Sequence, residues 1–90
     1  ADNAQYWMGE ASYVLQDNAA AQAAFEAVIT RYPDSPKVPD ALLKIGYLQH
    51  AEGQHAAARQ TLQQLVERYP GTTAATLAQQ RLARLARETG

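Results

Sequence analysis

The sequence predicts an all-α protein in which two helix-turn-helix repeats stack side by side and a fifth helix caps the C-terminal end, forming an α-α superhelix. Three observations lead to this prediction. The chain repeats itself at a constant offset, its apolar residues recur with the period of an α-helix, and a proline ends each repeat at a matching place.

The repeat is visible when the chain is laid over itself. Gly9 recurs as Gly46, an offset of 37 residues, and the same offset joins two alanine blocks and two Arg-Tyr-Pro segments: Ala19 to Ala21 with Ala56 to Ala58, and Arg31 to Pro33 with Arg68 to Pro70. Periods of this size are typical of stacked repeats in which each unit buries its apolar face against the next.

Each repeat contains two stretches with helical spacing of apolar residues. The second helices carry Ala21, Phe25, Val28, Ile29 and Tyr32 in one repeat and Ala58, Leu62, Leu65, Val66 and Tyr69 in the other. The first helices carry Ala4, Met8, Ala11 and Leu15, and then Ala41, Ile45 and Leu48. We expect these stripes to be the packing faces, and Gly9 and Gly46 to let the two helices of each repeat approach closely.

The predicted helices run over residues 3–16, 18–31, 37–52, 55–68 and 73–87 of a single domain spanning 1–90. Repeat 1 covers about 3–36, repeat 2 about 37–73, and the capping helix about 73–88. Gly53 suits the end of a helix, whereas Gln16 at the matching place does not, so the first turn is expected to differ. The third helix begins at either Pro36 or Pro39.

Composition and spacing exclude several classes of function. Eight Lys and Arg residues against nine Asp and Glu residues give a net charge of −1, which argues against nucleic acid as a partner. No apolar run is long enough for membrane insertion. There is no cysteine, and the two histidines, His50 and His55, have no metal ligand at short spacing, so we expect no metal and no cofactor. No catalytic constellation is present, and we expect no enzyme activity.

The candidate binding residues lie on the first helices, on the face opposite the packing stripe. Read at the offset of 37, they form three columns: Tyr6, Leu43 and Gln80; Glu10, Tyr47 and Arg84; Tyr13, His50 and Arg87. Aromatic and arginine side chains there suit a concave groove for a helical or extended partner. The alternative is that these columns only stack neighbouring first helices on each other. Trp7 is left open between a core residue and an exposed anchor.

These residues also resemble a known repeat. The tetratricopeptide signature of an apolar residue before glycine, an A-x3-F step and a closing proline is similar to Met8-Gly9, Ala21 with Phe25, and Pro33; the second repeat gives Ile45-Gly46, Ala58 with Leu62, and Pro70. Gln5 and Leu42 replace the tryptophan of the pattern, and Ser12 and Gln49 replace its tyrosine. The period is three residues longer than the usual 34 of this repeat.

A narrower resemblance covers nearly the whole chain. The segments 3–11, 31–37, 40–46, 68–72 and 78–82 resemble the C-terminal domain of the periplasmic cell division coordinators of the Tol-Pal system, the CpoB or YbgF family. The resemblance implies a periplasmic protein of Gram-negative bacteria that binds the central helical region of TolA and couples outer-membrane constriction to the septal peptidoglycan synthase machinery. It also implies a further repeat upstream, and a trimer only where an N-terminal coiled coil is present, so this domain alone need not trimerise.

Three other functions compete with this one. Outer-membrane assembly lipoproteins with the same repeats share the individual motifs. A receptor for acidic chaperone tails would carry lysines and asparagines on the first helices, where this chain has Tyr6, Glu10 and Tyr13 and then Leu43, Tyr47 and His50. A substrate-binding accessory domain of an enzyme would be revealed by a catalytic domain upstream.

Overall fold

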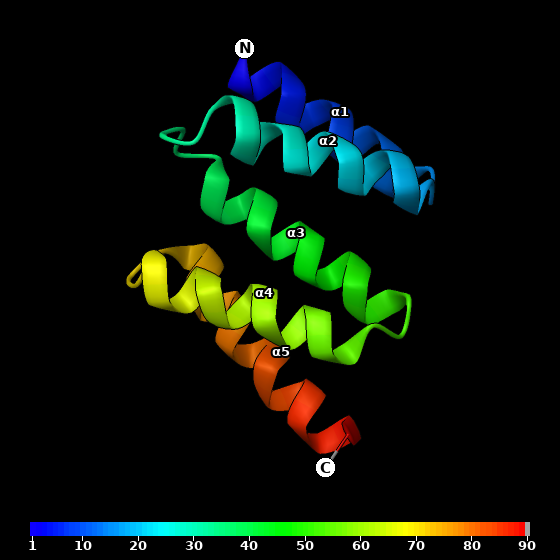
Figure 1. Cartoon of the computed structure of the whole chain (residues 1–90), viewed down its shortest axis with the longest axis vertical. Helices are drawn as coiled ribbons and strands as arrows, with labels where there is room; N and C mark the ends of the chain where they lie inside the picture. Colours follow the sequence, from blue (N-terminus) through cyan, green and yellow to red (C-terminus); the bar gives the residue numbers. More distant parts are fainter. Residues whose placement is uncertain (90) are drawn as a thin grey trace.

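The computed structural model describes residues 1–89 as five α-helices in sequence: α1 (Asp2–Val14), α2 (Asn18–Arg31), α3 (Val38–Ala51), α4 (His55–Arg68) and α5 (Thr73–Thr89). No strand occurs in this part of the chain. The predicted fold is therefore confirmed, with every helix boundary within two residues of its prediction. Figure 1 shows α1 and α2 as one antiparallel pair, α3 and α4 as the next, and α5 against the second pair, with the two termini at opposite ends of the molecule.

Two hydrophobic clusters hold the layers together. The first joins α1, α2 and α3 and contains Tyr6, Ala21, Phe25, Val28, Val38, Ala41, Ile45 and Leu48. The second joins α3, α4 and α5 and contains Leu43, Ala58, Leu62, Leu65, Ala74, Ala78 and Leu85. Tyr69, directly before Pro70, packs against both clusters. The helix α3 belongs to both clusters because it is covered on two sides, so it forms the centre of the stack.

The two helix-interior glycines permit close approach within each repeat. A Cβ atom on Gly9 would lie 2.6 Å from Cε1 of Phe25, and one on Gly46 would lie 2.5 Å from Cδ2 of Leu62. Both distances are far inside van der Waals contact. Ala83 stands at the corresponding position of α5 and is exposed, since no second helix covers it among the described residues.

The two turns within the repeats have the same conformation, which corrects the expectation that they differ. Gln16 has a φ of 61° and Gly53 a φ of 77°, so both residues adopt the left-handed region. The hydrogen bonds also match: the Asp17 amide donates to the Ser12 carbonyl and the Gln54 amide to the Gln49 carbonyl, each at 2.9 Å. This is the closure that helix ends with a left-handed residue commonly use, and in the first repeat a glutamine accepts the strained conformation.

The helices that follow the inter-repeat turns start differently. The helix α3 begins at Val38, so Pro39 occupies its first turn and Pro36 lies outside it. The Ser35 hydroxyl donates to Oδ2 of Asp2 at 2.6 Å, which ties the turn to the start of α1 rather than capping α3. In contrast, Oγ1 of Thr72 accepts from the Ala75 amide at 3.1 Å and caps α5, as its residue type predicts.

The predicted packing stripe of the first helix is wrong. Ala4, Met8, Ala11 and Leu15 are exposed, Met8 at 60% and Leu15 at 79%, whereas Tyr6 and Gly9 form the buried side of α1. The corresponding stripe of α3, with Ala41, Ile45 and Leu48, is buried because α2 packs on it. Among the helices of residues 1–89, none covers this face of α1. Trp7 lies beside this face and is exposed at 58%. Of the two alternatives for Trp7, a core residue or an exposed one, the structure therefore shows the exposed one.

Candidate functional site

The predicted columns lie on α1, α3 and α5, which together form what we call the first-helix surface; the residues that one helix contributes to the columns form a row. The exposure of these residues differs. Tyr6 and Leu43 are buried, at 7% and 5% exposure, each in one of the two hydrophobic clusters. Their assignment to an open groove is therefore corrected: Tyr6 packs on Phe25 of α2, with ring centres 5.4 Å apart, and shares a cluster with residues of α3, whereas Leu43 shares one with residues of α4 and α5. Burial also raises the pKa of Tyr6 to about 12, with a smaller contribution from the negative charges of Glu10 and Asp40.

The second and third columns, which contain Glu10 and Tyr13, carry contacts that recur with the repeat. Nζ of Lys44 on α3 lies 3.3 Å from Oε1 of Glu10 and 4.9 Å from the ring centre of Tyr13, both on α1. One repeat later, the guanidinium carbon of Arg81 lies 4.0 Å from the ring centre of Tyr47. A cation of α3 thus lies over a half-buried tyrosine of α1, and a cation of α5 lies over a half-buried tyrosine of α3.

This arrangement gives the tyrosines a partner inside the molecule. Stacking between neighbouring first helices, the alternative weighed from the sequence, accounts for the contacts of Tyr13 with Lys44 and of Tyr47 with Arg81. Tyr13 and Tyr47 are half-buried, so each keeps part of its ring at the surface beside the cation.

The last row of the first-helix surface is open. Gln80, Arg84 and Arg87 on α5 are exposed, and they line a pocket of about 250 Å³ together with Tyr47, Leu77 and Arg81. We call Gln80, Arg84 and Arg87 the C-terminal row. Its two arginines stand where the preceding row has Tyr47 and His50.

His50 joins α3 to the end of α5 through three side chains. Nη1 of Arg81 donates to Nδ1 of His50 at 3.2 Å, because a guanidinium can only donate. The proton of the neutral ring is then on Nε2, which lies 2.6 Å from Oε1 of Glu88. Nε of Arg84 donates to the other oxygen of Glu88 at 3.1 Å. The hydrogen bond from His50, and then the one from Arg84, lowers the pKa of Glu88 below its ordinary value.

The same network brings together a group that short sequence spacing could not predict. His50, His55 and Glu88 each offer a ligand atom within 4.8 Å of the others, and Nδ1 of His55 is buried without a hydrogen-bond partner. The expectation of no metal rested on the absence of a further ligand at short spacing in the sequence, and the fold corrects this reason because it brings Glu88 beside the two histidines. The guanidinium groups of Arg81 and Arg84 bond to two of these three side chains, and their positive charges oppose a cation at this place.

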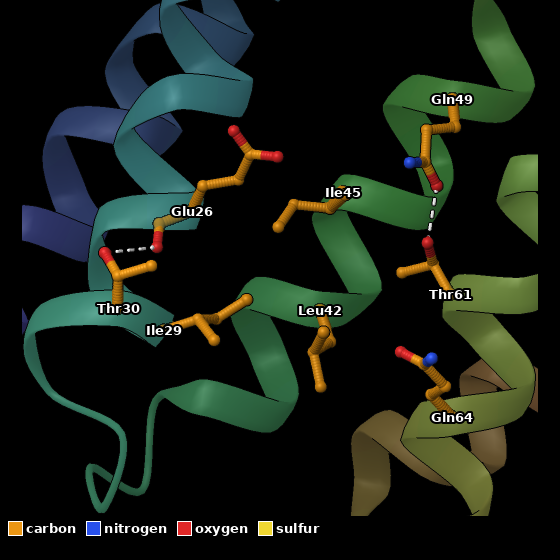
Figure 2. A pocket seen from close by; sticks show the side chains of 8 residues that line it. All are labelled: Glu26, Ile29, Thr30, Leu42, Ile45, Gln49, Thr61 and Gln64. Carbon is orange, nitrogen blue, oxygen red and sulfur yellow. Dashed lines mark hydrogen bonds between the residues drawn. The ribbon is translucent and has the colours of Figure 1, made fainter.

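A second depression lies between the two second helices and was not predicted. Figure 2 shows Glu26, Ile29 and Thr30 of α2 facing residues of α3 and α4 across a pocket of about 380 Å³. Ile45 and Leu42 provide apolar lining, and the Thr61 hydroxyl donates to Oε1 of Gln49 at 2.7 Å within it. The lining residues come from three helices and are not related by the offset of 37 residues, so comparison of the two repeats could not predict this pocket.

The model of the family described as the tetratricopeptide repeat matches residues 3–35 and 40–72, which is most of the chain and both helix pairs. The chain belongs to the tetratricopeptide repeat family. A search of curated proteins found no significant match to it.

Membership of the tetratricopeptide repeat family gives the chain a general function. Such repeats are protein-interaction modules, so a protein partner is expected, and they are generally without catalytic activity. Among residues 1–89, no helix combines the length and the hydropathy needed to cross a membrane.

Proposed function

We propose that this chain is an adaptor of the Gram-negative cell envelope, located in the periplasm, that binds the central helical region of TolA and helps coordinate outer-membrane constriction with septal peptidoglycan synthesis. The observation behind the proposal is the resemblance of five segments, from residue 3 to residue 82, to the repeat domain of the Tol-Pal coordinators. An adaptor needs a surface rather than a pocket for chemistry, and a stack of tetratricopeptide repeats supplies one.

The first-helix surface is the part of the molecule that we assign to the partner. Tyr13 and Tyr47 present partly exposed rings, and Glu10, His50, Arg84 and Arg87 surround them with polar groups of both signs. Interfaces with protein helices commonly combine a few aromatic anchors with a polar rim. Tyr6 and Leu43 contribute by shaping the core below this surface and not by contact.

The proposal predicts that the purified central region of TolA binds the chain. Tyr13→Ala and Tyr47→Ala should each weaken this binding by about 2 kcal/mol, the loss typical of an aromatic anchor at an interface. Titration calorimetry measures the affinity, and circular dichroism checks that both variants remain folded. The matched control is Tyr32→Ala, which removes a half-buried tyrosine from the turn after α2, outside the first-helix surface.

Two results would contradict parts of the proposal. Unchanged affinity in both tyrosine variants, with normal binding by the parent chain, would move the partner to another face. Failure of the parent chain to bind would count against TolA and favour a partner from another envelope assembly, such as the outer-membrane assembly lipoproteins whose repeats share these motifs. Fractionation of cells that produce the full-length protein tests the periplasmic location independently.

A further inference from the structure

The pocket between the two second helices takes no part in the proposed TolA contact. Its lining side chains come from α2, α3 and α4, with those of α3 lying between the other two sets (Figure 2). None of the lining residues belongs to the columns of the first-helix surface. A ligand in this pocket therefore leaves the first-helix surface open to another partner.

The apolar part of the pocket lies over the joint between the two repeats. Ile29 packs against the first hydrophobic cluster, and Leu42 packs against both clusters. These two side chains are half-buried, while Ile45 beside them is buried. A volume of about 380 Å³ holds a few side chains but not a helix of several turns, which is about 10 Å wide.

The charge of the pocket comes from Glu26. It is the one charged residue of the lining, it is exposed, and it makes no ion pair within residues 1–88. Figure 2 shows its side chain extending from α2 towards Ile45 of α3. At the offset of 37 the corresponding residue is Gln63, so the repeat does not require a carboxylate at this position. A group that complements the pocket is therefore positively charged.

Two side-chain amides add hydrogen-bonding groups to the lining. The Thr61 hydroxyl donates to Oε1 of Gln49, which leaves Nε2 of Gln49 as a donor, and the amide of Gln64 forms no hydrogen bond within residues 1–88. Such amides can pair with backbone N–H and C=O groups. An extended segment presents these backbone groups, whereas a helix uses them internally. The pocket thus suits an extended segment.

We propose that this pocket binds an extended segment of a protein partner in which a lysine or arginine follows a leucine, isoleucine or valine. The branched apolar side chain packs on Ile29 and Ile45, and the cation pairs with Glu26. The side-chain amides of Gln49 and Gln64 bond to the backbone of the segment. This second surface goes beyond the TolA contact and allows one chain to hold two partners at once.

Capped dipeptides test this proposal without TolA. The chain is labelled at its isoleucine and leucine methyl groups and titrated with acetyl-Leu-Lys-amide, observed by NMR. Saturable shifts should appear at Ile29, Leu42 and Ile45, and the affinity should fall at higher salt. Acetyl-Leu-Gln-amide should bind about threefold to fivefold more weakly, since an exposed ion pair contributes modestly. Acetyl-Ala-Lys-amide, which lacks most of the apolar contact, should bind about tenfold more weakly.

Variants of the chain locate the cation. Glu26→Gln should weaken binding of acetyl-Leu-Lys-amide by about threefold to fivefold and remove the preference for lysine over glutamine. Glu26→Lys should weaken it by at least about tenfold and favour acetyl-Leu-Glu-amide. The matched control Asp34→Asn removes an exposed carboxylate from the turn between α2 and α3, outside the pocket lining, and should leave the affinity unchanged.

The outcomes separate this pocket from the TolA contact. Absence of saturable shifts at the pocket methyl groups, equal losses in Glu26→Gln and Asp34→Asn, or a lysine preference that persists in Glu26→Gln would overturn the proposal. Loss of TolA binding in a folded Glu26→Lys variant would contradict two separate surfaces. Dipeptide binding as expected, combined with no binding of TolA by the parent chain, would support the pocket and contradict only the partner named above.

Discussion

At the scale of single residues, Gln16 is the position where the sequence and the backbone disagree. Its φ of 61° places it in the left-handed region, which L-residues with a Cβ atom reach at a cost of roughly 1 kcal/mol. The second repeat uses Gly53 for the same turn. The first turn therefore contains a strain that the second does not.

Gln16→Gly is expected to raise the free energy of unfolding, because relief of this strain exceeds the entropy that glycine adds to the unfolded chain. The expected gain is about 0.5 to 1 kcal/mol, measured by urea unfolding. The reciprocal change Gly53→Gln should destabilise by a similar amount. A loss of stability in Gln16→Gly would show that the glutamine side chain contributes a contact that outweighs its backbone strain.

Gly46→Ala should be more costly, since the new methyl group would lie 2.5 Å from Cδ2 and 2.7 Å from Cγ of the fully buried Leu62. Helix α4 must then shift away from α3, and we expect a loss of about 1 to 3 kcal/mol in chemical denaturation. Ala83→Gly in α5 is the control: it makes the opposite exchange at the corresponding uncovered position and should cost about 1 kcal/mol from helix propensity alone. A stability gain in Gly46→Ala would refute the close-approach role of this glycine.

At the scale of the elements, the sequence predicted the helices better than their faces. A helical wheel with one apolar stripe predicts one packing side. In this stack a first helix can pack against three other helices, as α3 does against α4 of its own repeat, α2 of the preceding repeat and the following first helix α5. Met8 and Ile45 share one wheel position yet differ in exposure because, within residues 1–89, a helix (α2) packs on this face of α3 and none packs on this face of α1. Tyr6 and Leu43 were predicted to be open because the wheel has only one packing side, whereas Tyr6 packs on Phe25 of α2 and Leu43 packs among residues of α4 and α5. The columns of the site were thus predictable, whereas their burial was not.

The attachment of the end of α5 should depend on pH through Glu88. The hydrogen bonds from His50 and Arg84 lower the pKa of Glu88 in the folded state below its ordinary value of 4.5. A lowered pKa in the folded state means that this contribution is present above about pH 4.5 and is lost as the pH falls through the folded value. Acidification below pH 4.5 should therefore loosen the last turns of α5.

Hydrogen exchange of the α5 amides, measured between neutral pH and pH 3 after correction for intrinsic rates, can test this dependence. In Glu88→Gln the protection of the last turns should already be low at neutral pH and should change little on acidification. Glu67→Gln, which removes an exposed carboxylate from α4, is the control and should keep the parent profile. An unchanged profile in Glu88→Gln would show that the His50 and Arg84 contacts do not hold the end of the helix.

At the scale of the whole molecule, the constant offset predicted the order of the layers, and the structure adds that the layers are unequally covered. The molecule is elongated, with extents of 39 × 28 × 17 Å. In such a stack, stability comes from each repeat and from its contacts with its neighbours, so end elements have fewer stabilising contacts than central ones. The helix α3 packs against α2, α4 and α5, whereas α1 packs chiefly against α2.

This inequality predicts a gradient of local stability along the chain. Native-state hydrogen exchange should give the highest protection in α3 and α4, which surround the buried Leu48, Leu62 and Leu65, and lower protection in α1 and in the last turns of α5. The Gly46→Ala variant provides a second measurement, because it weakens the central α3–α4 contact and should reduce the protection of every helix towards that of α1. Protection in α1 equal to that in α3, in the parent chain under conditions where it is monomeric, would mean that all five helices unfold as one unit and would contradict the gradient.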